Sequence, residues 1–230
     1  IIVPMEDKKD AEKIKIMADN YLEKRYDELF NGSSHKKKVV RKGISLDSLL
    51  LKNRSHRGYD ENYIVSEEEL RDIVKVCSKV PSAKNQQVLR FKIVTKESGG
   101  EKVLRNIKFG GALPELKLPF PGEAPYAYII ICSTIGDGRW VGIDLGMVAQ
   151  SMLLKCVEMG LNGICIGAFN KQVITEMFDL PYEPLLILAI GKGIEKIQLL
   201  GIREGENQTY FRDKGIHYVP KLGVDDLIIP

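Results

Sequence analysis

The sequence predicts a fold that mixes helices and strands within one main domain. Amphipathic helices with recognisable start signals alternate with apolar segments of strand length. A chain of 230 residues is long enough to bury a full core, and 44% apolar with 28% charged residues is ordinary for a globular protein. These observations favour a single hydrophobic core surrounded by a charged surface.

Residues 1–44 are expected to form a helical extension that precedes a main domain at residues 45–230. Apolar side chains recur at helical spacing from Asp10 to Phe30, and the polar segment that follows, residues 31–34, ends this helix. The basic run at residues 35–38 is short and has no interleaved aromatic residues. A solvated surface is therefore favoured over a nucleic-acid patch.

Two helices are expected next, one on each side of the first polar cluster. Ser45 is the N-cap of the first, which should carry Leu46, Leu49 and Leu50 toward the core. The second begins with a capping box at Ser66-Glu67-Glu68-Glu69. Its buried stripe and its stop signal follow at helical spacing: Leu70, Ile73, Val74, Cys77 and then Pro81.

Four segments are expected to form strands. Residues 89–93 alternate apolar and charged side chains, which is typical of a strand with one buried face. Residues 126–132 are continuously apolar, so both faces of that strand should be buried. Residues 164–169 and 185–190 complete the set, with a short helix expected over residues 171–178 between them.

The longest helix is expected over residues 142–159. Apolar side chains cover nearly its whole circumference, so it should be enclosed on all sides, which indicates a subunit interface. Before it, the Gly- and Pro-rich segment 97–125 is predicted to be a lid or binding loop, because connections this long are usually functional.

Charge and cysteine content argue against several classes of function. A net charge of +3, from 34 basic and 31 acidic residues, gives no strong case for nucleic acid. No apolar run is expected to approach the ~20 residues that cross a membrane. The four scattered cysteines are expected to be buried, reduced thiols, which indicates the cytoplasm. No histidine spacing supports a metal site.

Two polar clusters carry the chemistry. Asn53-Arg54-Ser55-His56-Arg57 offers two guanidinium groups and a hydroxyl, which suit an oxyanion such as phosphate. Pro81-Ser82-Ala83-Lys84-Asn85-Gln86-Gln87 offers amide and hydroxyl groups for the edge of a polar ring. Together they indicate a nucleotide-like cofactor. Taken singly, each has an ordinary alternative: a solvated helix end, and polar loop residues.

From Ser45 onward the chain resembles the FMN-dependent nitroreductase family. The clusters match the family's Arg-Ser-x-Arg and Pro-Ser-x-x-Asn-x-Gln segments, residues 142–154 are similar to its central helix, and residues 158–169 are similar to its flavin-facing turn. The resemblance implies an α+β fold, a three-layer α-β-α sandwich with a central mixed, mainly antiparallel sheet. It also implies an intertwined homodimer with FMN at the interface between subunits.

The resemblance implies roles for residues at both ends of FMN. Arg54, Ser55 and Arg57 would hold the phosphate and ribityl chain, and Lys221 would add a further cation to the phosphate. Asn53 stands where many relatives have Arg, which would weaken one phosphate contact.

At the ring end, Asn85 and Gln87 would bond the polar edge of the isoalloxazine, while Gly167 would present its backbone amide near N5. The remaining ring-end residues share a supporting role, either lining the approach or presenting backbone: Pro81, Ser82 and Ala168.

By this resemblance the chain is expected to be an FMN-dependent NAD(P)H oxidoreductase. NAD(P)H would transfer hydride to flavin N5 and leave before a nitroaromatic or quinone-like acceptor enters, a ping-pong cycle in which the flavin and no protein residue carries the chemistry. Phe109 and Phe120 are candidate ring-stacking groups for this small-molecule acceptor. Two alternatives stay open: an FMN-binding protein without turnover, and a flavin-consuming or dehalogenating enzyme on the same fold. Neither nucleic acid, a membrane nor a metal is expected as a partner.

Overall fold

The structure, a computed structural model, describes residues 43–111, 113 and 115–229. Apart from its last two residues, the predicted helical extension lies outside the described residues, as does the basic run within it. The described helices and helical turns are α2 (Leu46–Lys52), α3 (Glu67–Lys75), η1 (Val76–Lys79), η2 (Ala83–Asn85), η3 (Lys96–Gly100), α4 (Glu101–Leu104), α5 (Arg139–Glu158), α6 (Lys171–Phe178) and η4 (Val224–Asp226). The described strands are β1 (Leu89–Val94), β2 (Ala127–Ser133), β3 (Asn162–Ile166), β4 (Glu183–Gly191), β5 (Lys196–Ile202), β6 (Phe211–Asp213) and β7 (Ile216–Leu222).

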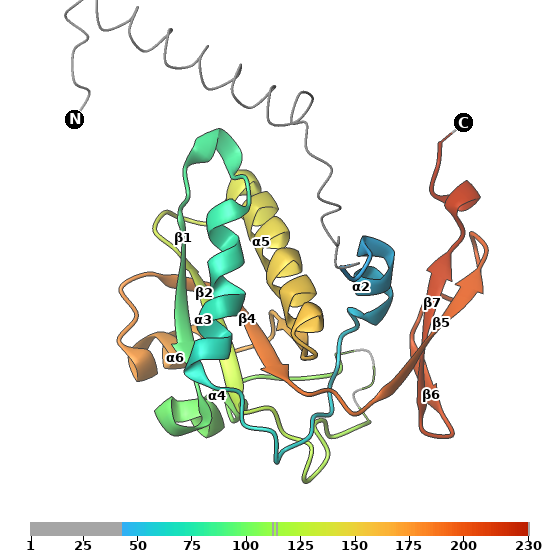
Figure 1. Cartoon of the computed structure of the whole chain (residues 1–230), viewed down its shortest axis with the longest axis horizontal. Helices are drawn as coiled ribbons and strands as arrows, with labels where there is room; N and C mark the ends of the chain where they lie inside the picture. Colours follow the sequence, from blue (N-terminus) through green and yellow to red (C-terminus); the bar gives the residue numbers. More distant parts are fainter. Residues whose placement is uncertain (1–42, 112, 114, 230) are drawn as a thin grey trace, which may run out of the picture. The chain divides into compact units, whose positions relative to one another are not determined.

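A four-stranded sheet forms the middle layer. Its strand order is β1-β2-β4-β3, and every neighbouring pair is antiparallel. Helices α3 and α5 cover one face, and α4 and α6 cover the other (Figure 1). This arrangement confirms the predicted α+β fold and its α-β-α layers. The parallel pairing expected of a mixed sheet occurs elsewhere, between β5 and β7.

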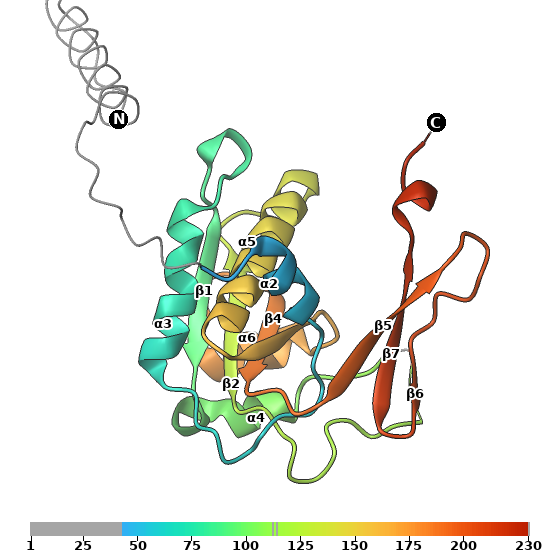
Figure 2. The same ribbon diagram turned by 45° about the vertical axis from the view of Figure 1, so that its right-hand side comes forward.

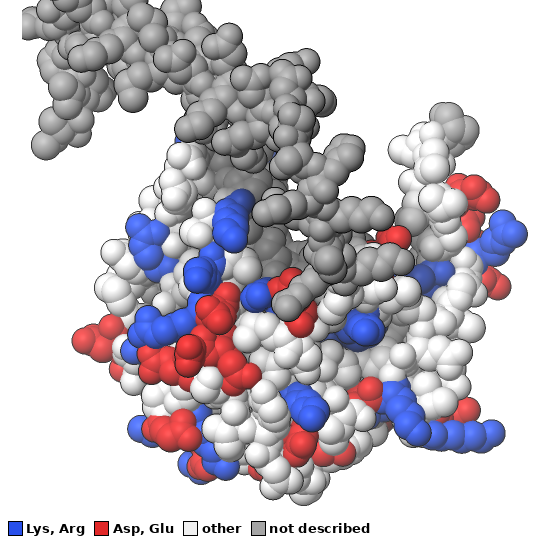
Figure 3. Space-filling model, viewed as in Figure 1, with Lys and Arg blue, Asp and Glu red and all other residues white. Residues whose placement is uncertain are grey.

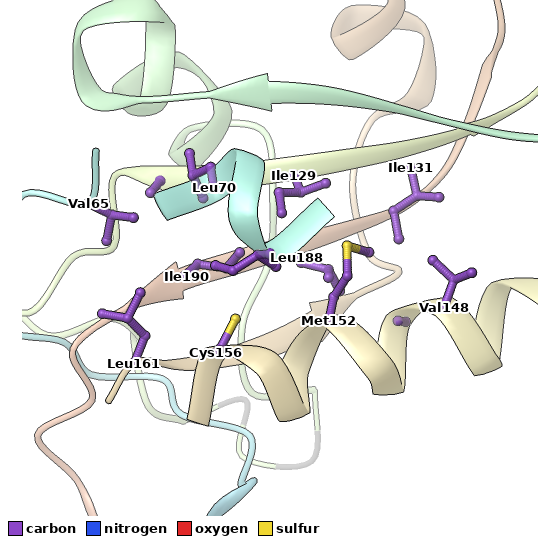
Figure 4. Packing of buried hydrophobic residues seen from close by; sticks show 13 residues of the cluster. Val65, Leu70, Ile129, Ile131, Val148, Met152, Cys156, Leu161, Leu188 and Ile190 are labelled. Atoms are coloured by element: carbon purple, nitrogen blue, oxygen red, sulfur yellow. The ribbon is translucent and has the colours of Figure 1, made fainter. Parts of the chain in front are cut away.

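The sheet separates two hydrophobic cores because successive side chains of a strand point to opposite faces. In β2, Ile129 and Ile131 face α3 and α5, whereas Ile130 faces α4 and α6. Figure 4 shows the first of these cores, in which Met152 and Cys156 of α5 point toward the sheet. All seven residues of β2 are buried, as their continuous apolar sequence predicts.

Polar caps start the helices where the sequence places them. The Ser66 hydroxyl accepts a hydrogen bond from the Glu69 N–H at 3.2 Å, and the Glu69 carboxylate accepts one from the Ser66 N–H at 2.9 Å. This capping box satisfies donors that the first turn of a helix leaves free. Ser45 is the N-cap of α2, and its hydroxyl accepts a hydrogen bond from the Ser48 N–H at 3.2 Å.

Helix α2 does not bury the residues expected to face the core. Leu46 is 61% exposed and Leu50 is 38% exposed, while Leu49 is half-buried. The helix contacts α5 and otherwise presents apolar side chains outward. The spacing of leucines correctly predicted an apolar face, but that face is uncovered in a single chain.

Helix α5 begins three residues earlier than expected and is not enclosed on all sides. Trp140 is 58% exposed and Ile143 is 42% exposed. Within the described part of the chain, α5 is long and apolar enough to meet the criteria for a membrane span, with a mean hydropathy of 1.3, so the expectation that no segment approaches this length was wrong. Core helices meet the same criteria, and α5 packs its inner face on the sheet.

A second, three-stranded sheet lies beyond β4, and the sequence analysis did not anticipate it. Strand β7 is central, parallel to β5 and antiparallel to β6. We call β5, β6 and β7 the C-terminal sheet. Figures 1 and 2 show it beside the layered body, joined to it through the segment after β4. Its strands supply one wall of the candidate site.

Two further expectations change in detail. The segment predicted as a lid, residues 97–125, begins with the helical turns η3 and α4 and continues without regular structure where it is described. Of the cysteines expected to be buried, Cys132 and Cys156 are buried, Cys77 is half-buried and Cys165 is exposed.

Candidate functional site

The segment 53–57, here called the Arg loop, follows α2 and pairs with β3, and the residues directly after it, 58 and 59, pair with the segment that follows β4. Ser55 pairs with Gly163 at the start of β3, and the Gly58 carbonyl accepts a hydrogen bond from the Ile194 N–H at 3.2 Å. Gly193 makes the close approach possible, since an added Cβ there would lie 2.2 Å from Nδ1 of His56. Gly191, which ends β4, and Gly193 therefore let the chain after β4 pack closely against Tyr59 and the Arg loop.

Four of the predicted phosphate residues meet in one pocket of about 260 Å³. The Arg loop supplies one wall, and the C-terminal sheet supplies the other through alternate residues of β7. We call this the basic pocket, and its lining is Asn53, Arg54, Ser55, Arg57, Ile197, Tyr210, His217, Val219 and Lys221. The structure thus brings Lys221 to the Arg loop from more than 160 residues away in sequence.

The cationic side chains of the basic pocket are not paired with a carboxylate from the part of the chain that the structure describes. Across residues 43–111, 113 and 115–229, no acidic side chain forms an ion pair with Arg54, Arg57 or Lys221. Arg54 donates to the Leu50 carbonyl at 2.5 Å, and Arg57 donates to the Ser55 carbonyl at 3.0 Å. Among the described residues, the buried Nε atoms of both arginines have no hydrogen-bond partner. Unpaired, oriented guanidinium donors suit an anion.

A buried carboxylate beneath the pocket is satisfied by other groups. Glu195, between β4 and β5, is 7% exposed and accepts hydrogen bonds from the Arg57 backbone N–H and from the Arg212 guanidinium. The Arg57 side chain instead lies over the Tyr210 ring, 4.8 Å from its centre. Glu195 therefore fixes the backbone of Arg57 while Arg212 neutralises its charge.

Two histidines border the cluster and are held neutral. Burial, together with the nearby Arg57 guanidinium, lowers the pKa of His217 to about 4. Burial also lowers the pKa of His56, opposed by Glu195 at 3.9 Å. Because neutral imidazole adds no charge, the positive charge of the basic pocket comes from Arg54, Arg57 and Lys221.

The segment 81–87, here called the amide loop, has a strained backbone. Lys84, Asn85 and Gln87 adopt φ angles of 51°, 54° and 48°, a left-handed region that residues other than glycine rarely adopt. Such strain tends to persist where the surroundings over-determine a functional conformation. Within the loop, the Gln87 side chain donates to the Asn85 side-chain oxygen at 3.2 Å, so these two amides are already oriented toward each other.

Asp144 of α5 holds the amide loop to the layered body. Its carboxylate is 3% exposed and accepts a hydrogen bond from the Ala83 N–H at 2.9 Å. Six residues later, the Gln150 side chain accepts from Asn53 at 3.3 Å. Both loops therefore attach to α5 at points roughly 9 Å apart along its axis.

The remaining predicted ring-end residues lie in two further places. Pro81, Ser82 and Gln87 line a groove of about 400 Å³ together with Asp144. Gly167 follows β3, and an added Cβ there would meet nothing within 4 Å. The Ala168 carbonyl accepts from the Lys108 N–H at 2.9 Å, and Ala168 lines a separate pocket of about 490 Å³.

The two aromatic residues proposed for the acceptor do not lie together. Phe109 packs on the core beside α6, whereas Phe120 is 37% exposed and lies beneath the Arg212 guanidinium, 5.7 Å from ring centre to charge. Phe120 lines a pocket of about 420 Å³ beside the basic pocket, and His217 borders both. In one chain, the structure unites the phosphate residues but not the ring-end or acceptor residues.

Sequence analysis missed Glu195, Arg212, Tyr210 and His217. His217 could have been found, because residues 217, 219 and 221 alternate on one face of β7 once that strand is recognised. Glu195 and Arg212 are isolated charges without a motif. Among the described residues no cluster of His, Cys, Asp and Glu has the arrangement of a metal site.

On the face shown in Figure 3, basic and acidic side chains are interspersed. The basic pocket is a local concentration of positive charge from Arg54, Arg57 and Lys221.

Comparison with known proteins identifies the family. A family model described as "Nitroreductase family" matches residues 50–192. The Bacillus subtilis protein named "Putative NAD(P)H nitroreductase YodC" is 26% identical over 173 residues, covering 61% of this chain and 86% of that protein. The Methanocaldococcus jannaschii protein named "Putative nitroreductase MJ1384" is 34% identical over 92 residues, covering 36% of this chain and 46% of that protein.

Crystal structures show the same fold. A nitroreductase family protein from Streptococcus pneumoniae TIGR4 has a TM-score of 0.55 at 15% identity, covering 67% of this chain and 93% of that one. A "putative nitroreductase in complex with FMN" from Exiguobacterium sibiricum also has a TM-score of 0.55, at 21% identity, with 66% and 89% covered. Since the family model spans more than half of the sequence, this chain belongs to the nitroreductase family.

Proposed function

We propose that this protein is an FMN-dependent NAD(P)H oxidoreductase that reduces a nitroaromatic or quinone-like acceptor. The observation that carries the proposal is the basic pocket, in which Arg54, Arg57 and Lys221 converge without an acidic partner in the described chain. Membership of the nitroreductase family supports it, as does the name of the related Bacillus subtilis protein, "Putative NAD(P)H nitroreductase YodC".

The residues present fit the phosphate end of FMN. A phosphate monoester carries close to two negative charges near neutral pH and offers three acceptor oxygens. The unpartnered Nε atoms of Arg54 and Arg57 are buried donors that lack such acceptors. Lys221, which is exposed, would add a screened and weaker attraction.

The amide loop and the segment after β3 are proposed to hold the ring end. Asn85 and Gln87 offer amide donors and acceptors on a backbone that Asp144 fixes in place. Gly167 leaves open space beside its backbone, which suits the close approach of a flat ring. When bound, the flavin supplies the hydride chemistry, and the protein orients it and excludes competing reactions.

We further propose that two copies of the chain pair to complete the site. Leucines of α2 and the first turns of α5 present large exposed apolar side chains that a single chain leaves uncovered: Leu46, Leu50, Leu51, Trp140 and Ile143. Burying such a face is the usual reason for an obligate homodimer. A second chain could also bring ring-end residues next to the basic pocket, which one chain does not do. Residues 45–230 are proposed as the main domain, and the cytoplasm as its compartment.

The test is one absorbance experiment on purified protein. Bound FMN gives a yellow protein, and anaerobic addition of NADH or NADPH should bleach the flavin absorbance. A nitroaromatic or quinone acceptor should then restore the flavin absorbance. Repeated cycles of bleaching and recovery would demonstrate turnover. A yellow protein that neither nicotinamide bleaches would favour an FMN-binding protein without turnover. Protein that stays colourless after incubation with excess FMN would contradict the proposal.

A further inference from the structure

We propose that Glu195 and Arg212 are positioning residues that fasten the C-terminal sheet to the Arg loop and thereby set the affinity for the phosphate end of the flavin. The inference rests on the proposed function. Neither residue lines the basic pocket, so each would act through Arg57 and the walls around it.

The contacts of Glu195 connect three segments. One carboxylate oxygen accepts from the Arg57 backbone N–H in the Arg loop, and the other accepts from the Arg212 guanidinium in β6. Glu195 itself stands between β4 of the layered body and β5 of the C-terminal sheet. A single buried side chain therefore joins both walls of the basic pocket.

This arrangement preserves the charge that an anion needs. If Glu195 paired with the Arg57 guanidinium, the pocket would lose one of its cations. Glu195 instead takes the backbone N–H, and the neutralising charge comes from Arg212, which is 22% exposed and lies outside the pocket. The Arg57 guanidinium stays stacked on Tyr210, with its buried Nε unpartnered.

Because the Glu195–Arg212 pair is largely buried, neither charge can lose its partner without a cost in stability. The Glu195 carboxylate is 7% exposed, so an uncompensated charge there would be costly, and each partner depends on the other. Replacing both members by apolar residues of similar size often leaves folding stability nearly unchanged. A variant of that kind can separate positioning from folding.

The experiment compares dissociation constants for FMN and for riboflavin, which lacks the phosphate. In the charge-neutral double variant Glu195→Leu/Arg212→Met, FMN should bind about 10-fold more weakly, because Arg57 loses its anchor, whereas riboflavin should change less than about twofold. The second variant, Glu195→Gln/Arg212→Met, keeps an amide oxygen for the Arg57 N–H but not the link to β6, so it should recover part of the FMN affinity. The matched control is Glu67→Gln/Arg71→Gln, which removes an exposed pair on α3 and should change neither constant.

The outcomes separate this inference from its alternatives. An FMN affinity unchanged from wild type in Glu195→Leu/Arg212→Met would overturn it. Equal weakening of FMN and riboflavin would also overturn it, because a purely structural role moves both. So would a Glu195→Gln/Arg212→Met variant that recovers nothing.

Inorganic phosphate provides a readout that does not depend on the flavin. Phosphate should raise the unfolding temperature of the wild-type protein, and should do so less in Glu195→Leu/Arg212→Met, with circular dichroism confirming that both are folded. Wild-type protein that binds phosphate but neither flavin would contradict the proposed function alone. Wild-type protein that is not stabilised by phosphate would contradict the positioning role as well.

Discussion

The basic pocket and the amide loop both hold polar groups in place, but they do so by different means. The pocket gathers residues from the Arg loop and from β7, and a buried carboxylate beneath it ties the segments together. The amide loop is local: seven consecutive residues carry three left-handed backbone angles and attach to α5 through Asp144. The pocket depends on tertiary assembly, whereas the loop depends on hydrogen bonds within itself and on one link to Asp144.

The largest expected effect separates the two ends of the ligand. Arg54→Ala removes a partly buried guanidinium with a free Nε and should weaken FMN binding by about 1.5–3 kcal/mol, roughly 10- to 150-fold, while riboflavin binding stays nearly unchanged. Fluorescence titration with each flavin measures both constants. Unchanged FMN affinity would remove Arg54 from the phosphate site.

Asp144→Ala should act at the ring end of the flavin, where Asp144 holds the amide loop. It leaves the Ala83 N–H without its acceptor, so the free energy of unfolding should fall by about 1–3 kcal/mol, and FMN and riboflavin should weaken equally. Asp144→Asn, which keeps a side-chain oxygen for that N–H, is the matched control and should lose less. Urea unfolding gives the stability, and a selective loss of FMN would show that the two regions are not independent.

A pH dependence should follow from His217, at the edge of the basic pocket. The folded pKa of about 4 lies below the ordinary 6.5, so the unfolded chain takes up a proton that the folded chain refuses between these values. Stability is therefore fully present above about pH 6.5 and falls as pH is lowered toward 4, by about 1–2 kcal/mol. In urea unfolding near pH 7 and near pH 4.5, His217→Gln should show a smaller decrease than wild type. An identical decrease would argue against the buried, neutral imidazole.

Lys221→Gln should have the smallest effect. Because this side chain is exposed, its attraction to a phosphate is screened, and the loss of FMN affinity should be about 0.2–1 kcal/mol at low salt. The difference from wild type should shrink as ionic strength increases. A loss as large as that of Arg54→Ala, independent of salt, would place Lys221 among the buried contacts instead.

The layered body could be predicted because its signals are local. The capping box at Ser66, the buried stripe that starts at Leu70 and the continuous apolar run of β2 each specify an element without reference to the rest of the chain. The same periodicity found the apolar face of α2 but could not say what covers it. A repeating pattern shows which side of a helix is apolar, but not which part of the protein packs against that side.

The C-terminal sheet could not be recognised in the same way. Pro220 argues against a central strand, because proline cannot donate to the ladder. In the structure, β6 pairs with β7 only over Ile216–Tyr218, so Pro220 stands where β7 has just one neighbour, β5. Without that strand, the alternation that places His217 beside Lys221 was hidden, and Glu195 and Arg212 had no pattern at all.

Gly191 and Gly193 have a practical consequence for anyone who would transplant this site. An added Cβ would collide with the Tyr59 ring at the first position and with His56 at the second. Residues 55–59 and 191–195 therefore pack closely against each other and have complementary shapes. A graft of the arginine segment into a host scaffold must carry the glycine segment with it, whereas the exposed Gly167 imposes no such condition on its side-chain position.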